Sequence, residues 1–119
     1  MLEKGEIEKR KKTAIFRGFE INLANGDTIK LPYIGVGKSS RKFWELLNEF
    51  ARKAESNNIA EMTEVAFDMF CQHVQKYYEV TKEELEDLIE MPELFKFVIE
   101  VQGISEITKV MKNINLNAK

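Results

Sequence analysis

The sequence predicts a mostly helical α+β domain, in which an N-terminal antiparallel β-hairpin precedes a compact bundle of four to five helices. Between residues 15 and 34, apolar and polar residues alternate on both sides of the Asn25-Gly26 step, a pattern typical of a hairpin. After residue 40, apolar residues recur at intervals of three and four, as in amphipathic helices. The length of 119 residues favours one domain with one self-supporting core.

The domain is expected to span residues 13–114. Residues 1–12 are rich in charge, with a mostly basic run at 8–12, and are expected to form a flexible lead-in. Residues 115–119 are expected to be a frayed, polar tail.

The register of the hairpin follows from which residues share a face. A two-residue loop at Asn25-Gly26 would set apolar residues opposite polar ones, whereas a three-residue loop over 25–27 keeps apolar partners on one face. We therefore expect the second arrangement, and a five-residue loop is an open alternative. The expected cross-strand pairs are Leu23 with Ile29, Ile21 with Leu31 and Phe19 with Tyr33.

Five helices are expected after the hairpin, at about 40–55, 59–79, 82–90, 93–102 and 105–114. The apolar stripe of the second is wide, which indicates a central helix contacted on more than one side. Residues suited to helix ends stand at most of these boundaries. They are Ser39 or Ser40, Asn58 with Glu61, Thr81 with Glu84, Pro92 and Gly103.

The net charge of −2 hides an uneven distribution. Residues 1–53 carry 12 basic and 7 acidic side chains, a net of +5, whereas residues 54–119 carry 6 and 13, a net of −7. The overall pI of about 5.6 argues against a dedicated duplex-DNA binder. Lys38, Arg41 and Lys42 crowd the start of the first long helix, where cations oppose the helix dipole. This is either a solvated basic end or a contact point for an acidic partner or a phosphate.

A phosphate-binding loop is not expected, although Gly37-Lys38-Ser39 matches the end of one. Pro32 replaces the first glycine of that motif and removes a backbone donor that the loop needs. The segment is therefore interpreted as a glycine hinge followed by a helix cap.

The remaining reactive side chains predict no catalytic or metal site. Cys71 and His73 are the sole cysteine and histidine, and a spacing of two on a helix does not place them on one face. An inert, buried or half-buried thiol and a packed, hydrogen-bonded histidine are expected. The carboxylates between 83 and 90 alternate with apolar residues, as on the wet face of an amphipathic helix. We expect no enzymatic activity, no cofactor and no metal.

The later helices offer candidate surfaces for a partner. The fourth helix is apolar around roughly 200° of its circumference, and the last carries a separate stripe. Each is either surplus surface for a partner or part of the core of a five-helix domain. With the basic start of the first helix, the candidate partner-binding residues are Lys38, Arg41, Lys42, Trp44, Phe95, Phe97, Ile99, Ile107, Val110 and Ile114.

The order of these parts suggests a family. A charged start, a hairpin closing on Asn25-Gly26, helices with acidic surfaces, and the stretch from Thr81 to Gly103 resemble the tail assembly chaperones of long-tailed bacteriophages. The similarity spans about residues 15–110 and rests on pattern. It implies a non-enzymatic protein of the host cytoplasm, absent from the finished particle. Such a protein binds the tape measure protein, keeps it soluble and recruits tail tube subunits, and self-association is also expected.

A small nucleic-acid-binding regulator is the second hypothesis. The basic residues of the first half, Lys38, Arg41 and Lys42 among them, would contact phosphates. Aromatic and basic residues interleave at 41–44 and 17–19, as on stacking surfaces, although aromatics at such spacings also fit a core.

Overall fold

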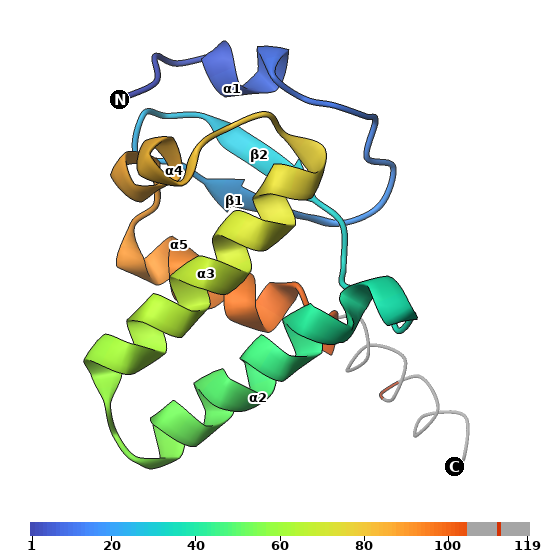
Figure 1. The fold of residues 1–119 in the computed structure, drawn as a ribbon. Helices are drawn as coiled ribbons and strands as arrows, with labels where there is room; N and C mark the ends of the chain where they lie inside the picture. Colours follow the sequence, from blue (N-terminus) through green and yellow to red (C-terminus); the bar gives the residue numbers. More distant parts are fainter. Residues whose placement is uncertain (105–111, 113–119) are drawn as a thin grey trace.

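The computed structural model, which describes residues 1–104 and 112, has a two-stranded hairpin between its N-terminal segment and the longer helices (Figure 1). The predicted fold class is confirmed, because the chain is mostly helical and its hairpin lies near the N-terminus. The elements are α1 (Glu6–Lys9), β1 (Phe19–Asn22), β2 (Thr28–Leu31), η1 (Lys38–Ser40), α2 (Arg41–Glu55), α3 (Ile59–Tyr77), α4 (Lys82–Leu88) and α5 (Met91–Glu100). The helix expected at 105–114 and the tail at 115–119 lie outside the described residues, apart from residue 112.

The cross-strand pairs expected for the hairpin are wrong by two residues. Five residues separate the strands, and the inner three form the turn, because the Leu23 N–H donates to the Asp27 carbonyl at 2.7 Å. Gly26 ends that turn with a φ of 91°, a left-handed conformation that glycine adopts without strain. The observed pairs are Phe19 with Leu31, Glu20 with Lys30, Ile21 with Ile29 and Asn22 with Thr28.

The apolar face of the hairpin is the floor of the core. Ile21, Ile29 and Leu31 are fully buried, and they lie beneath α3 and α5, which contact β2 and β1 respectively. The other faces of the strands carry polar residues, as the alternation in the sequence predicts. The hairpin is therefore stabilised by the helices that cover it.

Helix α3 is central, as its wide stripe predicts. It packs along α2 and also contacts α5 and β2. Asn58 caps its start by accepting a hydrogen bond from the Glu61 N–H at 3.1 Å, but the Glu61 carboxylate pairs with Lys53 at 2.6 Å. Only half of the expected capping box therefore forms here. The capping box formed by Thr81 and Glu84 at the start of α4 has both of its hydrogen bonds.

The helix expected at 93–102 begins two residues earlier than predicted. Helix α5 starts at Met91, so that Pro92 lies in its first turn, where a missing N–H costs no hydrogen bond. After the helix, Gly103 has a φ of 71° and its N–H donates to the Glu100 carbonyl at 2.9 Å. No helix among the described residues is long and apolar enough to cross a membrane.

Residues 1–12 are part of the domain, so the expected flexible lead-in is wrong. Leu2 and Ile7 are buried in the core, and the Gly5 N–H donates to the Asp27 carboxylate at 2.8 and 2.9 Å. Near the end of the segment, Lys11 forms an isolated β-bridge beside α3. We call residues 1–12 the N-terminal strap. In Figure 1 this strap runs along one side of the hairpin. Two single apolar residues within a charged run give no periodic pattern, so the sequence hides this packing.

Candidate functional site

The basic residues predicted at the start of the first long helix meet at one corner of the molecule. Lys38 and Arg41 line a hollow of about 220 Å³ together with Val36, Gly37 and Trp44, and both cations are exposed. Lys42 is also exposed but does not line the hollow. We call residues 36–44 the basic corner.

The segment before α2 leads straight into that helix and is hydrogen-bonded to it. Lys38–Ser40 form one turn of 3-10 helix that leads directly into α2. Ser40 precedes the helix, as expected, but its side chain makes no capping hydrogen bond. The Trp44 indole N–H donates to the Gly35 carbonyl at 3.0 Å and so ties the preceding segment to the helix.

The candidate residues of α5 divide between core and surface. Phe97 is fully buried, and its ring packs against those of Phe43 and Phe70, with centroids 6.3 and 5.2 Å away. The expectation that Phe97 binds a partner is therefore wrong. Phe95 is partly buried, with its ring centroid 6.1 Å from that of Phe50, whereas Ile99 is 52% exposed. The candidates Ile107, Val110 and Ile114 lie outside the described residues.

A second surface is an apolar groove between α3 and the α4–α5 junction. This groove was not predicted from the sequence. Phe67 of α3 lines it together with Ile89, Met91 and Leu94. Its volume is about 240 Å³, and carboxylates of α3 and α4 stand at its rim. We call it the acidic groove, after the carboxylates at its rim. Two features of the sequence point to this groove. One is the apolar Met91, which lies next to Pro92 in the first turn of α5, and the other is the wide apolar stripe of α3.

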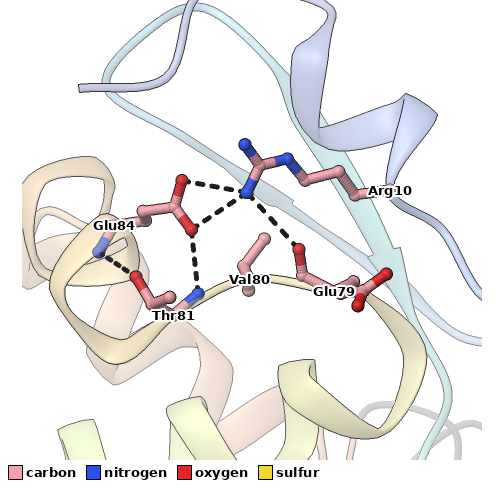
Figure 2. A pocket seen from close by; sticks show the side chains of 5 residues that line it. All are labelled: Arg10, Glu79, Val80, Thr81 and Glu84. Atoms are coloured by element: carbon pink, nitrogen blue, oxygen red, sulfur yellow. Dashed lines mark hydrogen bonds and ion pairs between the residues drawn. The ribbon is translucent and has the colours of Figure 1, made fainter.

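A hollow of about 440 Å³ is lined by Val80 and by polar groups that are bonded to one another (Figure 2). Arg10 Nη1 lies 2.9 Å from each carboxylate oxygen of Glu84 and 3.5 Å from the Glu79 carbonyl. Glu84 also accepts from the Thr81 N–H at 3.0 Å, and this bond, together with Arg10, holds the pKa of Glu84 below its ordinary value. The bonds between Arg10 and Glu84 hold the N-terminal strap against the start of α4.

The reactive side chains of α3 are buried, as the sequence predicts. Cys71 is 4% exposed, and burial raises the pKa of its thiol to about 12, so it is a poor nucleophile. His73 is packed and hydrogen-bonded to the Pro32 carbonyl. Among residues 1–104 and 112, no three His, Cys, Asp or Glu side chains gather closely enough to hold a metal ion.

The carboxylates of α4 and the turn after it form a wet face, with one exception. Glu83, Glu86, Asp87 and Glu90 are exposed, as expected. Glu84 is only partly exposed, because it turns toward the N-terminal strap. This acidic face adjoins the acidic groove.

No model of a known protein family matches the chain, and neither does any curated protein or solved structure.

Three surfaces stand out in this geometry: the basic corner, the outer side of α5 and the acidic groove. The basic corner combines three exposed cations, two of which line its hollow, with the apolar Val36 and Trp44. The outer side of α5 and the acidic groove offer apolar surface close to carboxylates. Surfaces of this kind recognise other polypeptides through apolar anchors and complementary charge.

Proposed function

We propose that this chain is a non-enzymatic tail assembly chaperone of a long-tailed bacteriophage. It binds the tape measure protein, keeps that protein soluble and recruits tail tube subunits in the host cytoplasm. The sequence resemblance, centred on the stretch from Thr81 to Gly103, supports this proposal. The structural observation that carries it is the apolar surface of α5 that lies outside the core of the described residues, where Ile99 is 52% exposed.

That surface lies on one side of α5, beyond the part that enters the core. Leu94, Phe97 and Val98 point into the core, whereas Phe95 and Ile99, four residues apart, extend the apolar face toward solvent. Helix α2 contacts this side through the rings of Phe50 and Phe95 but packs chiefly along α3. An apolar face that continues past the core suits the docking of a partner helix with its own apolar stripe.

The test is protection of a tape measure fragment from aggregation. Light scattering of an aggregation-prone fragment is followed with and without an equimolar amount of the full chain. We expect the chain to suppress scattering and the Ile99→Ser variant to bind the fragment about tenfold more weakly, because about 1.4 kcal/mol of apolar burial is lost.

Lys96→Ser is the matched control for this experiment. Lys96 lies on the same helix and is exposed, but it is not part of the apolar face, so its truncation should leave protection unchanged. A wild-type chain that never suppresses aggregation of any tape measure fragment contradicts the proposal. If Ile99→Ser and Lys96→Ser weaken binding equally, the apolar face of α5 is not the surface that binds the fragment.

Nucleic-acid binding is the second candidate function, favoured by the exposure of Lys38, Arg41 and Lys42 on one corner. Phe19 and Phe43 are buried and cannot stack on bases, which leaves the partly buried Trp44 as the one aromatic side chain among the described residues that line the hollow of the corner. Binding would therefore depend chiefly on phosphate contacts. Mobility shifts of duplex and single-stranded probes at low salt test it. A shift that disappears steeply with added salt supports this function, and the absence of any shift removes it.

A further inference from the structure

The acidic groove presents apolar surface to a partner. Leu94 is buried at its base, Phe67 and Ile89 are partly buried, and Met91 is 45% exposed. The groove is open and lies where α3 contacts α5, and Leu85 and Leu88 anchor α4 in the same core, so its shape does not depend on a single loop.

The rim of this groove is negative. Glu64 of α3 and Glu86 of α4 line it, and both are exposed. The neighbouring cation, Lys82, lies 5.7 Å from the centroid of the Phe67 ring and is paired with Asp68 at 3.1 Å. Because Asp68 offsets the charge of Lys82, the groove favours an occupant with an apolar side chain flanked by cations.

The chain carries such a surface on the basic corner. Val36 is 96% exposed at its tip, and the exposed cations Lys38 and Arg41 line the same hollow. The hydrogen bond from Trp44 to the Gly35 carbonyl holds this segment against α2, so little order has to be gained on binding. In Figure 1 the start of α2 lies on the right of the molecule, whereas α4 and the start of α5 lie on the left.

We propose that the acidic groove docks the basic corner of a second copy of this chain. Val36 of one copy enters the groove of the next, and Lys38 and Arg41 lie opposite Glu64 and Glu86. Charge complementarity selects this occupant, because the corner belongs to the half of the chain with net charge +5 and the groove to the half with −7.

This contact joins two different surfaces. It is therefore heterologous, and a docked pair keeps one corner and one groove free for further copies. Copies add head to tail into a ring or an open chain. The contact is independent of the proposed chaperone activity, since Phe95 and Ile99 belong to neither surface, and self-association can fail while client protection persists.

The first experiment measures self-association of the full chain. Sedimentation velocity over a range of concentrations should show oligomers whose association constant falls at least about tenfold when NaCl rises from about 50 to about 500 mM. Val36→Ser should weaken association about tenfold through loss of the apolar anchor. A strict monomer at low salt and high concentration overturns the proposal, as does association that is indifferent to salt.

A charge swap tests the pairing of the two surfaces. Lys38→Glu with Arg41→Glu should abolish self-association, and so should Glu64→Lys with Glu86→Lys. An equimolar mixture of these two variants should associate again, because each then meets opposite charge on both of its surfaces. Folding of both variants is checked by circular dichroism, and recovery in the mixture itself shows that neither is misfolded.

A matched control carries the same change in net charge elsewhere. Lys9→Glu with Lys76→Glu alters two exposed cations that lie outside both surfaces, and it should associate within about twofold of the wild type at about 150 mM salt. Association that survives either charge reversal, or a mixture that stays monomeric, overturns the pairing of corner and groove.

Discussion

The Nε2 atom of His73 lies 2.6 Å from the carbonyl oxygen of Pro32, so a side chain of α3 is bound to the segment that follows β2. A carbonyl oxygen only accepts hydrogen bonds, so Nε2 carries the proton in this contact. Nδ1 is buried and has no hydrogen-bond partner in the part of the chain that the structure describes. A second proton on the ring would be buried without an acceptor, and burial accordingly lowers the pKa of His73 to about 4.

The first prediction is a loss of stability in mild acid. An imidazole with an ordinary pKa of 6.5 in the unfolded chain and about 4 in the folded chain binds more protons when unfolded. The stability contribution of neutral His73 is therefore complete above pH 6.5 and is lost as the pH falls to 4. The free energy of unfolding should fall by about 3 kcal/mol across that window, measured by denaturant titration at each pH.

The His73→Gln variant is the control, because it removes the titrating group. Carboxylates also titrate at the acid end, so the difference between the two stability curves isolates the histidine. A variant that is less stable at every pH is still informative, because the prediction concerns how the free energy of unfolding changes with pH. Parallel curves for the two proteins between pH 6.5 and 4 contradict the assignment.

The second prediction is slow reaction of the native thiol. Cys71 is buried, and burial raises its pKa to about 12, so both access and thiolate formation are suppressed. Labelling with a disulfide reagent at pH 8 should be at least about a hundredfold slower in the native protein than in denaturant. The Cys71→Ser protein with Ser39→Cys, an exposed position, should react at the rate of a free thiol. Equally fast labelling of Cys71 in the native protein contradicts the prediction.

The helices could be predicted from the sequence because their signals are local. The stripe that contains Phe43 and Phe50 defines α2, and the Thr81–Glu84 box defines the start of α4. The hairpin was also predictable, but its register was not. A shift of two residues keeps Phe19 and Ile21 on the same face, so burial alone does not distinguish the two arrangements.

The surfaces were less predictable, since they depend on how elements meet. Helix α5 is apolar on so many sides that the sequence cannot separate Phe97, which enters the core, from Ile99, which does not. The acidic groove exists because Met91 and Ile89 lie beside Phe67, which is set by tertiary packing. The three cations of the basic corner were predictable because they lie close together in the sequence at the start of the first long helix.

The third prediction concerns the N-terminal strap. Ile7 is 1% exposed within the core, so Ile7→Ala should lower the free energy of unfolding by about 2–5 kcal/mol. Phe16→Ala is the contrast, because that ring is 91% exposed and its loss should change stability by less than about 0.5 kcal/mol. Denaturant titrations of both variants provide the measurement. A neutral effect of Ile7→Ala would show that the strap does not belong to the cooperative core.

The fourth prediction concerns the hairpin turn. Gly26 has a φ of 91°, and a β-carbon there would meet only the Lys4 side chain at ordinary contact distances, so the cost of a substitution is conformational. Gly26→Ala should therefore destabilise the protein by about 1–2 kcal/mol. Gly37→Ala is the matched control. Gly37 has a φ of −76° and open space around it, so alanine there should be neutral or stabilise by up to about 1 kcal/mol.

The two glycine variants also test the register of the hairpin. In the expected register the loop spans residues 25–27, and Gly26 would occupy its middle position, which does not need a left-handed backbone. In the observed turn Gly26 is the last loop residue, where the left-handed conformation is required. A Gly26→Ala protein as stable as the wild type in thermal and denaturant unfolding would favour the expected loop, whereas selective loss of stability at Gly26 supports the pairing of Ile21 with Ile29.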